Sequence, residues 1–490
     1  MTHPSDETLY KYNADLAPVK ASQKTWTAYN FLTVWMGMVH NIISYEVAGG
    51  LILLGMSAWE AIFTIIVGNL ILLVPMLLNG YQGTRLRVPF PVLIRSSFGV
   101  KGAVIPVILR AVVGIGWFSV QTYFIATIFN SLLALLWHGW THVGGSFNFL
   151  GMNLTGWITF MLSWFLNVLI LRHGMNSIKR FEAWAGPLVL ILALGLIIWS
   201  VRVSHGFGPL FHQGAHFPKG QNLSTVFVPA LTGVISSWAT LVLNIGDFTR
   251  FSETQRAQIV GQSLGLPGTA IVFSFMSIMI TSGSLVAFGH AIWNPITLLT
   301  HFHNIVILAL GGFALVIATI SVNVSANIVS PAYDITNLFP RHLNFVSAGI
   351  VAATLAIFLM PWKLMQNPTT LFTFLGAIGG LLGPVAGVMI ADFWLIHHRR
   401  IHVMALYQRD GAYSYWHGFN LRALAALGLG VSTSAIGYFN TSLHWLYAYS
   451  WFIGLGLALV VYWVLSRIWP GEAQELSSTN EMINAALSNE

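Results

Sequence analysis

The sequence predicts an all-α integral membrane protein with 12 transmembrane helices. Of its 490 residues, 22 are basic and 15 acidic, so 8% are charged, whereas soluble domains carry roughly 25%. Hydrophobic residues make up 56% of the chain and the mean hydropathy is +0.71. The apolar runs are continuous over the ~20 residues that a bilayer-spanning helix needs. They do not alternate with polar residues as the strands of a membrane barrel do.

Gly, Pro and Asn divide these runs into spans. A polar segment, 1–27, precedes the first span, which begins too late and runs too long for a cleaved signal peptide. Two five-span halves, 28–204 and 225–396, precede a final pair, 419–468, and a polar tail, 470–490, expected to be disordered. The spans are predicted at 28–55, 57–81, 103–137, 152–172, 184–204, 225–249, 263–290, 303–333, 343–361, 370–396, 419–439 and 444–468.

The basic residues predict the orientation of these spans. With an even number of spans and the N-terminus inside, 19 of the 22 Lys and Arg residues lie on the inner side. Arg202, Lys219 and Lys363 are the three on the outer side. Because inner loops of membrane proteins are enriched in basic residues, we expect both termini in the cytoplasm. The predicted location is the cell (inner, cytoplasmic) membrane.

Spans 1 and 6 hold corresponding positions in the two halves, and both are interrupted. Span 1 places His40, Asn41 and Glu46 among apolar residues with glycines on both sides, and span 6 has a weakly helix-forming stretch, Gly233 to Ser237, just before Trp238. Interrupted helices in matching places of two repeats are the sequence mark of a carrier whose site lies at the unwound midpoints.

Two further spans carry polar side chains at helical spacing. Trp117 and Gln121 share one face of span 3, and Asn323 and Asn327 share one face of span 8. Indoles offer stacking surfaces, and amides offer paired donors and acceptors. These residues suit a planar, neutral ring with alternating N–H and C=O groups. The spans contain no cluster of Arg or Lys residues, which argues against an anionic substrate.

Each feature also has a structural explanation. A tryptophan is often an interfacial anchor, and mid-span Asn and Ser residues often join helices. An integral-membrane enzyme would need a catalytic set that the sequence does not show, and a channel would need a repeated pore loop. The coincidence of polar features in spans 1, 3, 6 and 8 favours a small-solute carrier over both classes.

The ordered motifs of the chain are similar to those of the nucleobase:cation symporter-1 family. They include NADLAPV, WMGMVHNI, GWFSVQTY, NIGDFTRF, SANIVSPAYD and LGPVAGVMIADFW, and they cover nearly the whole chain. Within the family, GMNSIKRFEAWAGPLV and IATISVNVSANIVSPAYDI most resemble the bacterial allantoin permeases. The resemblance implies the leucine-transporter fold: two inverted five-helix repeats plus two C-terminal helices, working by alternating access with cation symport.

The resemblance also implies roles for individual residues. The ring would stack between Trp117 and Trp238, while Gln121 and Asn327 hydrogen-bond its polar edge. Further residues at the substrate site would be Asn323, Asn41 and Ser237. A sodium ion would take oxygen ligands from Gly37, His40, Ala318, Ser321 and the position of Val322.

Val322 departs from the family's pattern, because valine has no oxygen to offer where the family has a hydroxyl. The departure favours a proton over sodium as the coupling ion, and a proton needs a titratable group. Glu46 in span 1 and Asp247 in span 6 are the candidates, with His40 a further one. Glu46 could instead face water, and Asp247 could form a gate ion pair with Arg250.

We therefore expect a permease with a planar ring substrate, a coupling cation and the lipid bilayer as partners. Allantoin or a related ureide is favoured, and sodium-coupled uptake of uracil, hydantoin, a purine or cytosine remains the alternative. We expect no cofactor, no metal beyond a possible sodium ion, no nucleic acid and a monomer.

Overall fold

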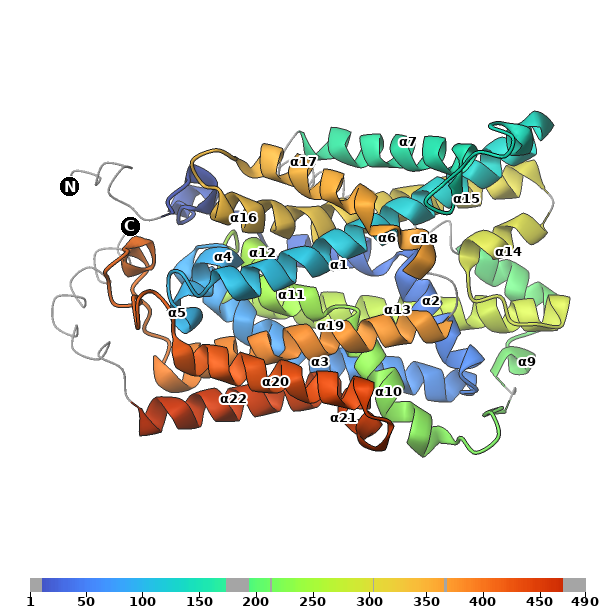
Figure 1. Ribbon diagram of the computed structural model, residues 1–490. Coiled ribbons are helices and arrows are strands. Elements are labelled where there is room, and N and C mark those ends of the chain that lie inside the picture. Colours follow the sequence, from blue (N-terminus) through green and yellow to red (C-terminus); the bar gives the residue numbers. More distant parts are fainter. Residues whose placement is uncertain (1–10, 173–193, 212–213, 303, 365–367, 470–490) are drawn as a thin grey trace.

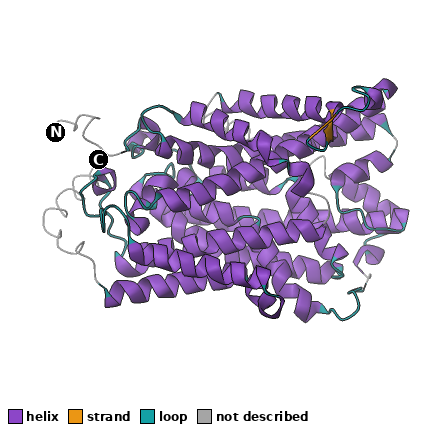
Figure 2. Ribbon diagram, viewed as in Figure 1, coloured by secondary structure: helices purple, strands orange, loops and turns teal. Residues whose placement is uncertain are grey.

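The computed structural model describes residues 11–172, 194–211, 214–302, 304–364 and 368–469. Within these residues the protein is a bundle of long helices lying side by side, with one short antiparallel hairpin, β1 (Asn148–Phe149) and β2 (Met152–Asn153), at its edge (Figures 1 and 2). Eight of the described helices are long and apolar enough to cross a membrane, and two bent helix pairs pass the same test. Two shorter apolar helices, Leu194–Val203 and Phe345–Leu359, complete twelve segments.

The helices follow the predicted order. In the first half they are α1 (Ala28–Val39), α2 (Ile42–Leu53), α3 (Ala58–Leu86), α4 (Phe90–Leu93), α5 (Arg95–Phe98), α6 (Val104–Leu136) and α7 (Leu154–Leu171). Next come α9 (Gly208–Phe211), α10 (Leu223–Ser236), α11 (Ala239–Asn244), α12 (Gly246–Thr249), α13 (Gln255–Phe288), α14 (Pro295–His301), α15 (Ile305–Val322), η5 (Asn323–Ile328), α16 (Val329–Leu338) and α17 (Phe345–Ala356). The remainder are α18 (Pro361–Leu364), α19 (Pro368–Ile390), η7 (Ala391–Ile396), α20 (Leu421–Phe439), α21 (His444–Ala448) and α22 (Ser450–Ile468).

Several predicted boundaries shift. Span 7 begins at Gln255 rather than residue 263, because its polar first turns continue the helix beyond the apolar run. Span 2 likewise extends to Leu86, where Arg87 ends it in the left-handed conformation. The first ten residues of predicted span 5, 184–193, lie outside the described residues, as do 1–10 and the tail 470–490.

Span 1 is broken as predicted, with a 60° bend between α1 and α2. His40 and Asn41 leave the helical conformation, Asn41 with an extended backbone (φ −142°, ψ 169°). The Asn41 side chain then caps the new helix by accepting a hydrogen bond from the Ser44 amide at 3.1 Å. The asparagine at this position therefore starts α2 within the membrane.

Span 6 breaks at the end of its weakly helix-forming stretch. The helix α10 continues through Gly233 to Ser236, and the chain bends by 46° at Ser237 and Trp238 before α11 begins. Span 8 contains a π-helical segment, η5, between α15 and α16. Single π-turns inside α-helices often mark functional sites. The three irregular segments thus fall on the spans where the sequence pattern fails.

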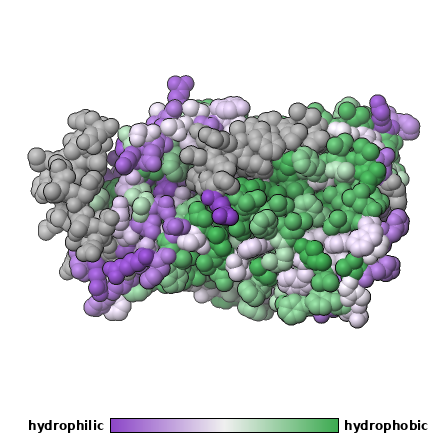
Figure 3. Space-filling model, turned by 90° about the horizontal axis from the view of Figure 1, so that it is seen from above, coloured by the Kyte–Doolittle hydropathy of each residue, from purple (hydrophilic) through white to green (hydrophobic). Residues whose placement is uncertain are grey.

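The molecule has two polar ends. One end, which we call the terminal face, carries the first and the last of the described segments together with α4, α5 and residues 397–420 (Figure 1). The opposite end, the distal face, carries α9, α14 and the hairpin. Between them, Figure 3 shows an extensive hydrophobic surface. Its exposed leucine, isoleucine, valine and phenylalanine side chains match the lipid contact expected of membrane helices.

Candidate functional site

The two breaks lie side by side in the centre of the bundle. Trp35, one turn before the break in span 1, packs edge-to-face on Trp238 at the break in span 6, with ring centroids 5.7 Å apart. Both indoles are buried. Two unwound segments that adjoin in a membrane interior expose backbone polar groups there, and this is tolerated only where the segments line a protein-enclosed site.

Trp117 and Gln121 lie on the part of α6 that is buried in the bundle. Their side chains are 4% and 3% exposed, yet Trp117 Nε1 and Gln121 Oε1 have no hydrogen-bond partner among the described residues. Leaving a buried polar atom unpaired costs about 1–3 kcal/mol. A donor and an acceptor left unpaired one turn apart indicate a place for a ligand that supplies the complementary pair.

The aromatic neighbours of the two predicted stacking residues differ. Trp117 packs edge-to-face on Phe374 of α19, with centroids 5.3 Å apart, while Trp238 packs on Trp35. The two indoles themselves are not in ring contact. Phe374 and Trp35 were not predicted as site residues, because no polar neighbour in the sequence distinguishes them from ordinary core residues.

The predicted amides separate into two groups. Gln121 Nε2 lies 3.5 Å from Asn41 Oδ1, which links span 3 to the break in span 1. Asn323 is already occupied, because its Nδ2 lies within 3.1–3.3 Å of Phe118 O, Thr122 Oγ1 and Asn167 Oδ1. Asn327 donates to Asn323 Oδ1 at 3.2 Å, and Ser237 Oγ donates to the Val234 carbonyl. Asn323 therefore joins spans 3, 4 and 8, and Asn167 is a site neighbour that the sequence analysis missed.

The predicted cation ligands fall on two helices in contact. Gly37 and His40 lie at the end of α1, and Ala318, Ser321 and Val322 lie in the last turns of α15, which packs against α1. The Val322 side chain is buried and apolar. The buried hydroxyl of Thr319, one turn before Val322, has no hydrogen-bond partner among the described residues. His40 Nδ1 contacts the Met36 carbonyl, and its ring packs on Phe273.

Glu46 is not in water. Its side chain is 1% exposed, and Oε1 accepts a hydrogen bond from Asn294 Nδ2 at 2.7 Å, while Oε2 has no partner among the described residues. Asn294 caps α14 on the distal face. Glu46 therefore connects the second half of span 1 to a helix that covers the bundle, a contact between residues 248 positions apart that the sequence could not reveal.

The expected ion pair of Asp247 with Arg250 is wrong. Asp247 instead accepts hydrogen bonds from the Phe90 amide at 2.7 Å and from Ser330 Oγ at 2.5 Å. The Arg250 guanidinium lies over the rings of Phe251 and Tyr333, 4.8 and 4.6 Å from their centroids. Asp247 therefore takes its direct hydrogen bonds from a backbone amide and a hydroxyl, and Arg250 acts on it only through its charge at longer range.

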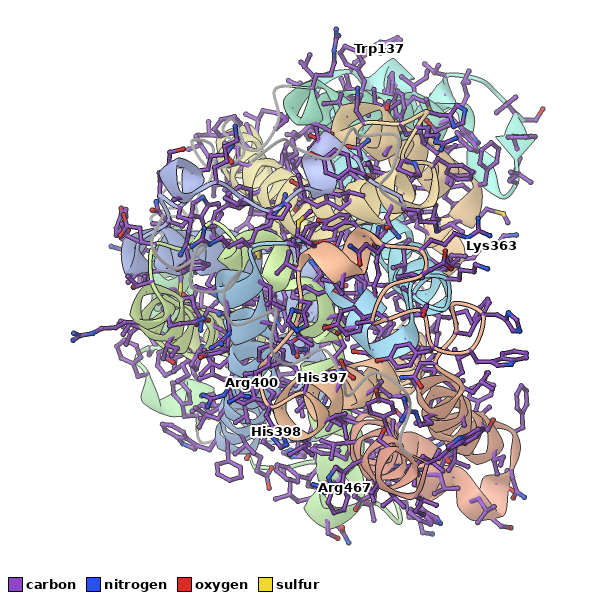
Figure 4. All side chains as sticks on the ribbon, turned by 90° about the vertical axis from the view of Figure 1, so that its left-hand side faces the viewer. Trp137, Lys363, His397, His398, Arg400 and Arg467 are labelled. Carbon is purple, nitrogen blue, oxygen red and sulfur yellow. The ribbon has the colours of Figure 1, made fainter. Side chains whose placement is uncertain are left out.

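A polar cluster on the terminal face lies apart from the breaks. His397, His398 and Arg400 lie near one another there (Figure 4), and His397 Nδ1 pairs with Asp392 Oδ1 at 3.2 Å. Burial lowers the pKa of His397, but the charge of Asp392 and the hydrogen bonds to it outweigh this and raise that pKa above its usual value. Within the described part of the chain, no three His, Asp or Glu side chains are placed to hold a metal ion.

These features define a class of protein. Among the described residues there are twelve apolar segments, two of them broken side by side at matching positions. A buried donor and acceptor without partners among these residues lie on a neighbouring helix. This is the architecture of a secondary transporter with its site near the membrane midplane. The comparisons with known proteins identify the family. Residues 18–454 match the model of the permeases for cytosine/purines, uracil, thiamine and allantoin, and the chain belongs to this nucleobase:cation symporter-1 family. It is accordingly a transporter and not an enzyme.

Curated relatives cover nearly the whole chain. An allantoin permease of Bacillus subtilis is 48% identical over 94% of each chain. A putative allantoin permease of Escherichia coli is 33% identical over 93% of this chain and 95% of its own. A purine-uracil permease of Arabidopsis thaliana is also 33% identical, over 98% of this chain and 82% of its own.

Solved structures share the fold. Mhp1, a nucleobase-cation-symport-1 family transporter in a closed conformation with bromovinylhydantoin bound, superimposes with a TM-score of 0.79 at 24% identity, covering 94% of this chain and 97% of its own. MhsT, in complex with L-phenylalanine, superimposes with a TM-score of 0.55 at 15% identity, covering 88% and 97%. The predicted leucine-transporter fold, with two inverted five-helix repeats and two C-terminal helices, is confirmed.

Proposed function

We propose that this protein imports allantoin, or a closely related cyclic ureide, by proton symport across the cell membrane. Both termini would lie in the cytoplasm, so that the terminal face is the cytoplasmic one, and the transporter would act as a monomer. The proposal is carried by the Trp117 Nε1 donor and the Gln121 Oε1 acceptor, which have no partner among the described residues, with Gln121 beside the break in span 1. A cyclic amide presents a C=O and an N–H side by side, which complements this pair.

The choice among ring compounds rests on similarity. The relative at 48% identity is an allantoin permease. Mhp1 has bromovinylhydantoin bound, and allantoin contains the same hydantoin ring. In this proposal Trp117 and Trp238 stack on the ring, Gln121 and Asn327 read its edge, and Asn41, Ser237 and Asn323 support them. Uracil, purines and cytosine are the competing substrates.

Proton coupling is supported by the chemistry of the cation position. Gly37, His40, Ala318 and Ser321 offer oxygen atoms, but the buried Val322 side chain offers methyl groups where sodium prefers oxygen. Glu46, buried and with one carboxylate oxygen unpaired by the described residues, is the proposed proton acceptor on the distal side. Asp247 is the other candidate, although its two hydrogen bonds favour a structural role.

A binding panel tests the substrate. The purified protein is titrated with allantoin, hydantoin, uracil, cytosine and hypoxanthine, with intrinsic tryptophan fluorescence and thermal unfolding as readouts. We expect allantoin to bind tightest and to quench the fluorescence of the indoles beside it. Tighter binding of uracil, cytosine or hypoxanthine than of allantoin would overturn the substrate assignment while leaving the transport class intact.

A further inference from the structure

A group of charged side chains is buried between the broken helix and the terminal face, outside the proposed substrate site. Arg110 of α6, Asp247 of α12 and Asp334 of α16 are each 0% exposed. The three helices lie together, because α16 packs against α6 and α4, and α12 packs against α4. Arg110 is one of the 19 basic residues on the predicted inner side, and no local sequence pattern distinguishes Asp334.

The two carboxylates have different surroundings. Asp247 accepts the two hydrogen bonds from Phe90 and Ser330 described above. Asp334 accepts none from the described residues, and its nearest cation, Arg110 Nη1, lies 3.9 Å from Oδ2, too far for a hydrogen bond. An ionised carboxylate that is fully buried without hydrogen bonds is costly. Of the two groups, Asp334 is the one that is better accommodated as a neutral acid.

Arg110 makes its directed hydrogen bonds elsewhere. Its Nε and Nη2 donate to Asn244 Oδ1 at 3.2 and 3.0 Å, and Nη2 also lies 3.3 Å from the Ala326 carbonyl. Asn244 Nδ2 in turn donates to Ser330 Oγ, which donates to Asp247. This chain, which we call the inner clasp (Arg110, Asn244, Ser330 and Asp247), ties the second half of the broken span 6 to spans 3 and 8.

The remaining charged groups around Asp334 are engaged by other partners. Arg250 lies over Tyr333 and Phe251 and donates to the Asp15 carbonyl at 3.3 Å. Arg95 donates to Asn337 Oδ1 at 2.5 Å, one turn beyond Asp334. The Asp15 carboxylate accepts from the Phe345 amide, and α17 carries no titratable side chain. Arg110 is therefore the cation that responds to the charge on Asp334.

We propose that Asp334 is a proton-binding site that controls the inner clasp. With the proton bound, Asp334 is neutral and the guanidinium of Arg110 holds Asn244. When the proton leaves to water, the carboxylate attracts Arg110 over the 3.9 Å that separates them. The guanidinium then gives up Asn244 Oδ1, and spans 3 and 6 separate at the terminal face. The inference rests on the proposed transport function only in assigning this movement to the transport cycle.

The test uses the absence of cysteine from the sequence. Val113→Cys places a single thiol on α6, buried one turn from Arg110. Labelling by a water-soluble maleimide is followed against pH in purified protein, without substrate or a gradient. An exposed Gln408→Cys variant corrects for ionisation of the thiol itself. We expect corrected labelling of Val113→Cys to rise with pH and this rise to be lost in Asp334→Asn, which stays neutral.

The inference would be overturned if labelling of the Asp334→Asn variant kept the pH dependence of the wild-type background. It would also be overturned if the Glu46→Gln variant lost this pH dependence while Asp334→Asn kept it. Where the asparagine variant does not yield folded protein by gel filtration, Asp334→Ser replaces it and the same outcomes apply. Because the labelling needs neither allantoin nor a proton gradient, its result is independent of the uptake experiments that test the proposed function.

Discussion

At the scale of single residues, the proposed substrate site depends on two polar atoms, Trp117 Nε1 and Gln121 Oε1. Trp117→Phe keeps an aromatic ring but removes the unpaired Nε1 donor, and we expect allantoin affinity to fall roughly tenfold, the equivalent of ~1.4 kcal/mol. Trp117→Ala and Gln121→Ala should abolish measurable binding with normal expression. Isothermal titration calorimetry measures the affinities, with Trp137→Phe as the control because Trp137 is 56% exposed at the far end of α6. Wild-type affinity in both alanine variants would remove the proposed site.

Glu46 is the residue proposed to accept the coupling proton. Glu46→Gln keeps an oxygen that can accept from Asn294 but cannot titrate, so we expect proton-driven accumulation of substrate to fall while exchange of labelled for unlabelled substrate persists. Both rates are measured in proteoliposomes, with the exposed Glu253→Gln as control. Accumulation equal to wild type would clear Glu46 of a coupling role.

At the scale of elements, the π-helical segment η5 separates structural from binding asparagines. Asn323 contacts spans 3 and 4, so Asn323→Ala should lower the free energy of unfolding by about 1–3 kcal/mol. Among the described residues, the Asn327 side chain donates only to Asn323, so Asn327→Ala should weaken substrate binding with a smaller loss of stability. Thermal unfolding and calorimetry measure the two effects. The reverse order of stabilities would show that Asn327, not Asn323, holds the helices together.

The end of span 10 predicts a pH effect on stability. Asp392 of η7 accepts hydrogen bonds from Ser96 of α5 and Tyr462 of α22 and pairs with His397. Because folding raises the pKa of His397, its stabilising contribution is fully present below the unfolded value of 6.5 and is lost as pH rises through the raised value. The thermal unfolding midpoint should therefore fall over that range. In His397→Gln this component of the fall should be absent, and an identical profile in both proteins would contradict the assignment.

At the scale of the whole molecule, the sequence predicted what local composition encodes. Apolar runs gave the spans, and the polar residues His40 and Asn41 marked the break that the structure shows as a 60° bend. Span 6 was harder, because Gly233 remains helical and the bend falls at Trp238. Helix ends were also uncertain where a polar first turn, as at Gln255, continues the helix outside the apolar run.

Contacts between distant parts of the chain could not be predicted. Glu46 meets Asn294, Arg110 meets Asn244 and Asp247 meets Ser330 across 248, 134 and 83 residues. No local pattern indicates which partner a buried charge will find, so Asp247 was matched with its sequence neighbour Arg250. The sequence also could not show whether Glu46 is buried or faces water, because its burial depends on where α14 packs.

Proton-driven allantoin uptake is tested most directly by transport into proteoliposomes. Proteoliposomes containing the purified protein are given an inward proton gradient, with sodium replaced by choline, and labelled allantoin inside them is followed with time. We expect allantoin to accumulate above its outside concentration and this accumulation to collapse on addition of a protonophore. Accumulation that requires sodium and ignores the proton gradient would contradict it.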